Sequence, residues 1–459
     1  MKEIEEEVLN SINQDYAVKT TQEIVRRPAW LDYRKPSSEW EWERAEYYQN
    51  KLTELGFDMV PISEVGEVSY RRPTLIGFLR GSERGQPGLF WTAHIDTHCP
   101  PHDMQRPCDG QIEDGEVKGL GTADQVGATG AVFGALDAIK KLNIKLKRDF
   151  MIFFCSDEMG GARGAELALR WMKKNNVIPE FGIVGEPTGN AIGLAHTGVS
   201  EFAVEVQGKT GHPSFKTKNI GLPMHNPVLR MMEVINTLSE IEEKEECFKM
   251  EHPLTGPSYT WFGPIIGSTV PHGTCSACGP WDPLLDGMTS AESFGHSTIY
   301  GHMQPEYCRI LFGVRAIPRK IKPGEMFHTE PEKGTSNKEA LEMVDRHLKG
   351  LWKRSPSATT YTLKRTRDHA VPYEISADEP HVKLLAEMME GATKKKPRFL
   401  GTKHWTEVGR QAQLIGTPFV QIAPTWVRYH RADEGVPITE LMEAARIYTG
   451  AILGFCKVA

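Results

Sequence analysis

Short apolar runs alternate with stretches of helical periodicity over roughly the first 200 residues. The runs Gly88–Ile95, Asp149–Cys155 and Phe181–Val184 are rich in aromatic and β-branched residues, which is typical of strands buried on both faces. Helical patterns at about Val126–Leu142 and Ala162–Lys174 separate them. Strands and helices that alternate at this spacing predict a parallel sheet with helices on its faces.

The pattern changes after about residue 200. Glu201–Gln207 alternates polar and apolar residues, which predicts a strand with one face in water. A long helix is expected over Pro227–Glu246. Further strands at Arg309–Val314 and Thr359–Arg367 flank a helix over Asn337–Lys353. This order predicts a small two-layer α+β domain of the split βαβ, ferredoxin-like type.

The segment between these elements reads as irregular. Trp261–Tyr307 is rich in Gly, Pro, Ser and Cys, and this composition predicts a loop. It contains Cys275 and Cys278 with His272 nearby. A single CxxC pair lacks the second pair of ligands that a zinc site needs, so we expect free thiols rather than a metal or redox site.

The doubly wound pattern resumes from about Glu379, with a strand at Phe419–Ala423 and a closing helix at Ile438–Cys456. A chain of 459 residues exceeds one ordinary hydrophobic core. We therefore expect a doubly wound, mainly parallel α/β catalytic domain made of residues 1–200 and 370–459. A smaller domain, residues 201–369, is expected to be inserted into it as a lid and dimerisation domain.

Composition narrows the function classes. The net charge of −6 argues against nucleic acid as a partner, because phosphate binding needs a basic surface. No apolar stretch approaches the roughly 20 residues that span a bilayer, and the acidic N-terminus does not resemble a signal peptide. Eight scattered cysteines fit reduced thiols. We expect a cytoplasmic enzyme with a small-molecule substrate.

Polar residues with metal-ligand chemistry follow the predicted strands. In open parallel sheets, functional groups collect beyond the carboxyl ends of the strands. One such residue alone is most often a surface or capping residue, whereas five at successive strand ends are hard to dismiss. Two histidines and three carboxylates suit zinc or a neighbouring divalent ion, and here they are His94, Asp124, Glu158, Glu186 and His430.

The chain resembles the acetylornithine deacetylase / succinyl-diaminopimelate desuccinylase / carboxypeptidase G family of dinuclear metallohydrolases (peptidase clan MH). The motifs that carry the resemblance are HID at His94, GLGTADQVGATGA around Asp124, CSDEMGG at Asp157 and Glu158, VGEPTG at Glu186, GKTGHPS at His212 and YHRADEGVPI at His430. The resemblance implies hydrolysis of an amide or peptide-type C–N bond in a small, carboxylate-bearing substrate. It also implies two divalent metal ions, zinc first with manganese or cobalt as alternatives, and a homodimer formed through the inserted domain.

The family roles transfer to matching positions. The resemblance implies that Asp124 bridges the two metals. His94 and Glu186 would complete the shell of one metal, and Glu158 and His430 that of the other. The metals would acidify a bound water and polarise the scissile carbonyl.

The identity of the general base stays open between two registers. In the first, Asp157 is the base and Glu158 the ligand. In the second, Glu158 is the base and Met159 occupies the ligand position, so one metal ligand is lost. We prefer the first register because it keeps the family's spacing from ligand to glycine. The family usually has Glu as the base, so Asp157 would reach about one methylene less far.

Three further residues take roles from the resemblance. Asp96 would accept a hydrogen bond from His94 and fix its tautomer. His212 would reach across a dimer to stabilise the tetrahedral oxyanion. Arg315 would bind the substrate carboxylate, because an arginine fork pairs bidentately with carboxylates.

Two alternatives remain beside amide hydrolysis. The first is hydrolytic deamination of an aromatic or other unsaturated amine at the same dinuclear site. The rings that would suit a flat substrate are His404, Trp405, Trp426 and Tyr429, although aromatic residues beside a strand end mostly pack the core. The second is a metal-loaded binding protein that the altered base has left weakly active.

Overall fold

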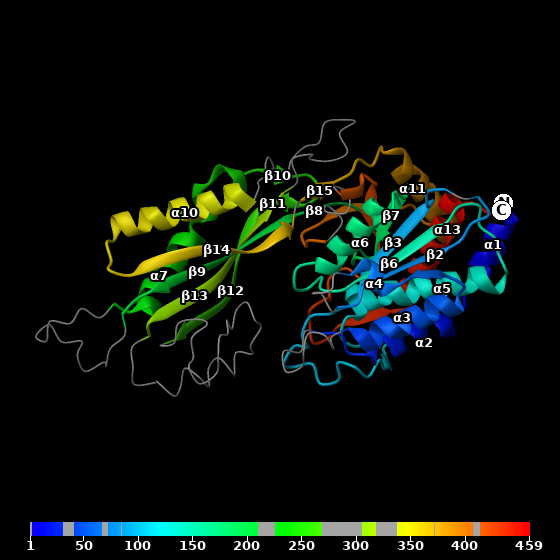
Figure 1. The fold of residues 1–459 in the computed structure, drawn as a ribbon, viewed down its shortest axis with the longest axis horizontal. Helices are drawn as coiled ribbons and strands as arrows, with labels where there is room; N and C mark the ends of the chain where they lie inside the picture. The colour runs from blue at the N-terminus through cyan, green and yellow to red at the C-terminus, as the bar shows by residue number, and fades with distance from the viewer. Residues whose placement is uncertain are drawn as a thin grey trace, which may run out of the picture. The chain divides into compact units, whose positions relative to one another are not determined.

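The computed structural model describes residues 2–30, 41–66, 72–83, 85–209, 225–268, 305–317, 337–370, 372–406 and 414–459. These residues form two compact units (Figure 1). One contains Met1–His196 and Tyr373–Ala459, and the other contains Thr197–Arg319 and Glu330–Pro372. The roles expected of them, catalysis for one and a lid and dimerisation for the other, stay predictions.

The first unit is built around a sheet that has nine strands in the described part of the chain. The strand order is β1-β2-β6-β3-β7-β17-β8-β15, with β16 beside β8. The strands are β1 (Asp58–Val60), β2 (Leu75–Leu79), β3 (Leu89–His94), β6 (Phe150–Cys155), β7 (Phe181–Val184), β8 (Ile192–His196), β15 (Tyr373–Glu374), β16 (Phe399–Thr402) and β17 (Phe419–Gln421). The central strands β6, β3, β7 and β17 run parallel, and every residue of β3, β6 and β7 is buried. This confirms the predicted α/β fold with a large, mainly parallel sheet.

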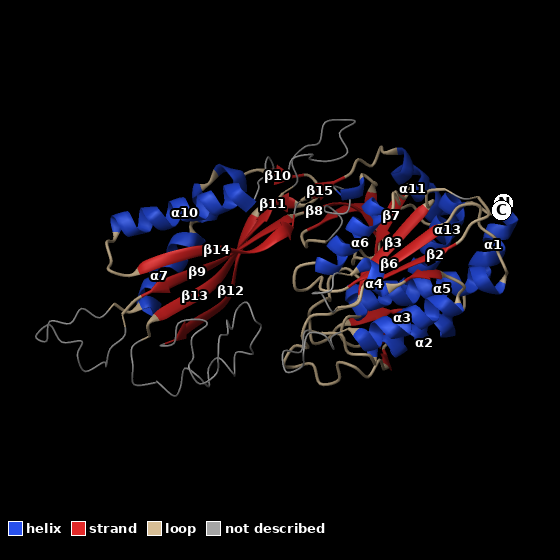
Figure 2. Cartoon of the chain, in the orientation of Figure 1, coloured by secondary structure: helices blue, strands red, loops and turns tan. Residues whose placement is uncertain are grey.

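Helices cover this sheet (Figure 2). They are α1 (Lys2–Ser11), α2 (Gln14–Val25), α3 (Trp42–Glu54), α4 (Ile62–Val65), α5 (Gly127–Lys141), α6 (Arg163–Lys174), α11 (Pro380–Thr393) and α13 (Ile438–Cys456). Helix α5 packs against α2 and α13, and its glycines permit this close approach. A Cβ atom on Gly130 would lie 1.9 Å from Oγ1 of Thr21 on α2.

A small three-stranded sheet places two distant segments together beside α5. It pairs β18 (Gly435–Pro437) with β5 (Glu116–Lys118), and β5 with β4 (Ile112–Glu113). A short irregular turn, η2 (Thr122–Val126), follows β5 and leads into α5. The pairing of β18 with β5 therefore brings the segment before β18 close to the turn that carries Asp124.

The second unit has a four-stranded antiparallel sheet in the order β12-β13-β9-β14. Its elements are β9 (Gly198–Gln207), α7 (Pro227–Ser239), α8 (Ile241–Lys244), η4 (Glu246–Phe248), β10 (Glu251–His252), β11 (Gly256–Pro257), β12 (Tyr259–Ser268), β13 (Tyr307–Ala316), α10 (Asn337–Arg354) and β14 (Thr360–Ala370). Helices α7 and α10 pack against each other and against β9. The apolar residues of β9 and β13 that contact them form the core of this unit.

Two expectations for the second unit were wrong. The predicted loop Trp261–Tyr307 begins as strand: β12 runs to Ser268 and pairs with β13. Gly263 and Pro264 hid this strand in the sequence, and they lie where the register shifts between Phe262 and Ile265. The predicted helix Pro227–Glu246 is interrupted at Glu240, after which α8 and η4 follow as separate short helices.

None of the helices in the described ranges is long and apolar enough to cross a membrane. The expected cytoplasmic location stays a prediction.

Candidate metal centre

His94 is the last residue of β3. The residue is 2% exposed, and its Nδ1 lies 2.7 Å from the backbone carbonyl oxygen of Asp96. A carbonyl oxygen only accepts, so Nδ1 carries the proton that is donated. The Nε2 atom then faces Oδ1 of Asp124 at 3.0 Å.

Asp124 lies in η2 between two histidines. Its Oδ1 faces His94, and its Oδ2 lies 3.0 Å from Nε2 of His430. Burial alone would raise the pKa of Asp124, but the imidazoles of His94 and His430 outweigh it and hold the pKa well below its usual range. Asp124 is therefore an ionised carboxylate that presents one oxygen to each histidine.

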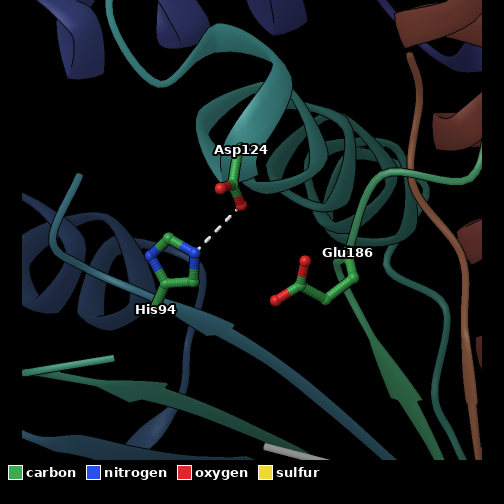
Figure 3. A group of neighbouring side chains, drawn as sticks. All are labelled: His94, Asp124 and Glu186. Carbon is green, nitrogen blue, oxygen red and sulfur yellow. Dashed lines mark hydrogen bonds and ion pairs between the residues drawn. The ribbon is translucent and has the colours of Figure 1, made fainter. Parts of the chain in front are cut away.

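Glu186 completes a group of three ligand atoms. It follows β7, which is the parallel neighbour of β3, and it is 4% exposed. The ligand atoms of His94, Asp124 and Glu186 all lie within 4.8 Å of one another, and Figure 3 shows the three side chains converging. In the described ranges, this is the only such group of three His, Cys, Asp or Glu residues.

These three residues fit a divalent cation. Nε2 of His94 and Oδ1 of Asp124 lie 3.0 Å apart, so a positive charge is needed between them, and either a proton on Nε2 or a metal ion can supply it. Burial lowers the pKa of His94, yet Asp124 and the nearby carboxylates Glu158 and Asp96 raise it well above its ordinary value. The cluster therefore favours a cation at this position, and histidine and carboxylate ligands are those that zinc takes.

Glu158 and His430 complete the predicted ligand set but lie outside this group of three. Glu158 is 5% exposed and follows β6, the other parallel neighbour of β3. The His430 side chain is 44% exposed, and its backbone adopts a left-handed φ of 60°. His430 contacts Asp124, so the structure brings it to the site.

Asp96 accepts the hydrogen bond of His94 through its backbone carbonyl, and the nearest carboxylate oxygen of Asp96 lies 3.8 Å from Nδ1. The carboxylate instead accepts the backbone N–H groups of Glu158 (3.1 Å) and Met159 (3.0 Å). The carboxylate of Asp96 therefore holds the segment that carries Glu158.

Asp157 lies next to Glu158, in a left-handed conformation with φ of 65°. Its carboxylate contacts the guanidinium of Arg72. Burial raises the pKa of Asp157; Arg72 opposes this shift, and Asp96 adds to it, leaving the pKa above its ordinary value. A raised pKa suits a group that must take up a proton.

The sequence did not reveal the side chains that hold the ligand segments. Glu434 accepts the backbone N–H groups of Gly121 and Ala123, both at 3.0 Å, and so braces the turn that carries Asp124. Glu41 and Arg72 contact the segment that carries Asp157. Glu434 stands within a matched motif and could have been found there, whereas Glu41 lies 116 residues from Asp157 with no spacing that links them.

The four ring residues expected beside the C-terminal ligand segment differ in their surroundings. Tyr429 and His404 are in contact, with the phenol oxygen 3.3 Å from Nδ1, and Nε2 of His404 lies 3.6 Å from Glu186. Trp405 is buried, whereas Trp426 is 38% exposed. His404 and Tyr429 therefore border the group of three ligands, and Trp405 packs in the core.

Arg315 is on β13 in the second unit, where it pairs with Val199 on β9 and Tyr259 on β12. His212 lies outside the described residues, as do Cys275 and Cys278.

Comparisons with known proteins place the chain in a family. The model of peptidase family M20/M25/M40 matches residues 90–454. The chain is 29% identical over 197 residues to a succinyl-diaminopimelate desuccinylase of Gluconacetobacter diazotrophicus, covering 41% of this chain and 49% of that protein. It is 28% identical over 236 residues to an acetylornithine deacetylase of Photorhabdus laumondii, covering 50% and 56%. The chain thus spans about half the length of these curated relatives.

Solved structures share the fold. Human carnosine dipeptidase 1 gives a TM-score of 0.71 at 15% identity, covering 99% of this chain and 100% of that one. A dipeptidase from Saccharomyces cerevisiae gives a TM-score of 0.73 at 12% identity, covering 100% and 99%. The family match confirms the resemblance that the sequence motifs carried: the chain belongs to peptidase family M20/M25/M40.

Proposed function

We propose that the protein is a metal-dependent hydrolase that cleaves an amide or peptide-type C–N bond in a small substrate. The observation that carries this proposal is the position of Asp124. Each of its oxygens lies 3.0 Å from a different histidine, and Glu186 lies in the same group of ligands as His94. A carboxylate placed in this way can bridge two metal ions.

The proposed assignment follows from this bridge. His94 and Glu186 hold one metal ion with Asp124, and Glu158 and His430 hold the other. Mixed histidine and carboxylate ligands favour zinc and also accept manganese or cobalt. When bound, the ions supply a Lewis acid for the scissile carbonyl and lower the pKa of water.

Asp157 is the proposed general base. Its carboxylate contacts Arg72 and accepts the backbone N–H of Arg163. These two contacts restrict the rotation of the Asp157 side chain. It would take a proton from the attacking water and later give it to the departing amine, so the proton is conserved between the two steps. Its raised pKa makes proton uptake easier than for an exposed aspartate.

The test is an assay of amine release on N-acyl amino acids and dipeptides. The chain reconstituted with zinc should release amine, and removal of metal by a chelator should abolish the release until zinc is added back. Full activity with no bound metal would overturn the proposal.

Arg315 is the proposed contact for a substrate carboxylate. Its guanidinium can form a bidentate pair with a carboxylate, and its side chain is half-buried on β13. Arg315→Ala should raise KM for an acid substrate and leave KM for its methyl ester almost unchanged. Arg346→Ala, which removes an exposed arginine paired with Glu245 in the same unit, is the matched control and should change neither KM. Equal use of acid and ester by the unmutated enzyme would contradict this role.

A homodimer formed by the second unit is also proposed. Strand β12 is an edge of its sheet and contacts α7. These two elements carry four exposed apolar side chains: Leu229, Met232, Phe262 and Ile265. The opposite edge, β14, carries Lys364 and Arg365, and charged residues discourage strand pairing. The mass in solution should be that of a dimer, and Ile265→Lys should shift it towards the monomer, whereas Met250→Lys should not.

The proposed role of His212 depends on that dimer. If His212 acts across it, mixing His212→Ala chains with Asp157→Asn chains should restore part of the lost turnover, because each mixed dimer keeps one complete site. No recovery in verified mixed dimers would mean that His212 does not serve the partner's site.

Deamination of an aromatic amine is the second candidate. The rings of His404 and Tyr429 border Glu186 and His430, and flat rings can stack on a planar substrate. Release of ammonia from aromatic amines, without release of amine from acyl amino acids, would favour this candidate over the first.

A further inference from the structure

The turn Asp157–Met159 is held through three consecutive backbone N–H groups. Asp157 N–H donates to Oε1 of Glu41 at 2.9 Å. The N–H groups of Glu158 and Met159 donate to the two carboxylate oxygens of Asp96, at 3.1 and 3.0 Å. The orientation of the turn is therefore set by two side-chain carboxylates as well as by the strand that precedes it.

Arg72 joins these two carboxylates to the side chain of Asp157. Its Nε and Nη2 donate to the two oxygens of Glu41, at 2.7 and 2.8 Å. Its Nη2 also lies 3.6 Å from Asp96, and its Nη1 donates to Asp157. The Arg72 side chain is 8% exposed, so these contacts form away from water, where charged hydrogen bonds are strong.

The network explains two unfavourable features of the chain. Three acidic side chains, those of Glu41, Asp96 and Asp157, lie around one cation, and burying acidic groups together is unfavourable unless a counter-charge holds them. Glu41 and Asp157 also adopt left-handed φ values of 69° and 65°, which residues with a side chain rarely do. Such positions persist where surrounding contacts fix them, and here both contact Arg72.

We propose that Arg72 is a positioning residue: through Glu41, Asp96 and Asp157 it fixes the turn that carries the general base and the metal ligand Glu158. This inference rests on the proposed function. Because Arg72 acts on the reacting groups and not on the substrate, it sets kcat rather than KM.

The experiment compares Arg72→Met with Arg72→Met combined with Glu41→Gln. The single variant should lower kcat by about 10–100-fold, as for other residues that orient ligands, with KM nearly unchanged. It should also lower the thermal midpoint. The double variant no longer buries an acid whose partner has been removed, so its midpoint should rise again while kcat stays low. Recovery of kcat along with stability would show a merely structural role and overturn the proposal.

Arg446→Met is the matched control. Arg446 belongs to the same unit and donates to the backbone carbonyls of Leu9 and Ala392, so its loss should lower the thermal midpoint without lowering kcat.

Cobalt binding to the chelator-treated protein gives a readout that does not depend on turnover. In the double variant, the first Co²⁺ equivalent should bind as in the unmutated chain. The second should bind more weakly and with an altered absorption spectrum, because Glu158 is no longer oriented. Unchanged binding of both equivalents would contradict the proposal. An unmutated chain that binds two equivalents but hydrolyses nothing would instead refute the proposed function, and the cobalt comparison would then decide the role of Arg72 by itself.

Discussion

The proposed metal centre has two halves that the chain builds in different ways. The buried half, His94, Asp124 and Glu186, is at most 6% exposed, and two of its residues come from the ends of the adjacent parallel strands β3 and β7. The open half consists of Glu158, on a turn held by other side chains, and His430, whose side chain is 44% exposed. The ends of packed parallel strands thus orient His94 and Glu186 directly, whereas Glu158, which also follows a parallel strand, lies on a turn that side chains from outside that strand hold in place.

This difference predicts that the two halves bind metal ions with unequal affinity. Ligands that the fold holds in place lose little freedom when a metal binds, so the ion in the buried half should bind more tightly. Exposure of His430 gives water and chelators access to the open half. Asp124 belongs to both halves and couples them.

The largest effect is expected for Asp124→Asn, which tests that coupling. An amide bears no charge and cannot bridge two cations as a carboxylate does, so both ions should be lost and turnover should fall to the assay background. Elemental analysis of the dialysed protein measures this. Retention of one tightly bound ion would show that the buried half does not need the bridge.

A smaller effect separates the base from its neighbouring ligand. Asp157→Asn should lower kcat by about 10²–10⁴-fold with metal content unchanged, because a general base contributes on that order. Glu158→Gln should lose the ion of the open half and keep the other. If Glu158→Gln keeps both ions and is the slower variant, the other register holds and Glu158 is the base.

Replacing Glu434, which braces the turn that carries Asp124, should weaken metal binding less than replacing Asp124. Glu434 uses both oxygens to accept N–H groups of the turn, and Glu434→Gln leaves only one oxygen that can accept. Metal affinity should fall by about 10-fold, within the range seen for residues that orient ligands. Competition with a chelator measures it. Glu443→Gln, which alters a carboxylate paired with Lys395 in the same unit, is the control and should bind metal normally.

The smallest expected effect is a change in the pH dependence of thermal stability when Glu41 is replaced. Burial, together with the nearby Asp96, raises the pKa of Glu41 from 4.5 to about 8, although Arg72 opposes the shift. Between these values, the folded chain holds a proton that the unfolded chain has lost. The stability that the proton on Glu41 contributes is therefore fully present below pH 4.5 and is lost as the pH rises to about 8. Glu41→Gln cannot titrate, so its thermal midpoint should fall less over this interval, and parallel curves for the two proteins would contradict the assignment.

The sheet could be predicted because its strands are continuous apolar runs, and candidate ligands were visible where those runs end. His94 closes one such run, and Glu186 follows another by two residues. The sequence could not show that Asp124 presents separate oxygens to His94 and His430, because residues 124 and 430 are 306 positions apart and the pairing of β18 with β5 brings their segments together.

The side chains that hold the Asp157 segment, and strand β12, could not be predicted from the sequence. Glu41 and Arg72 act on Asp157 through contacts that span 116 and 85 residues, and no local pattern encodes such contacts. Nor could the sequence show that the carboxylate of Asp96 accepts the backbone N–H groups of Glu158 and Met159. Strand β12 was missed because Gly263 and Pro264 lower its strand propensity, and its pairing with β13 outweighs that.

Anomalous diffraction from zinc-reconstituted crystals would show directly whether Asp124 bridges two ions. Two peaks about 3–4 Å apart are expected, as in other two-metal hydrolases, with Asp124 between them. The stronger should lie among His94, Asp124 and Glu186, and the weaker beside Glu158 and His430. No peak at Asp124, or a single peak that persists at saturating zinc, would contradict a bridged pair of ions.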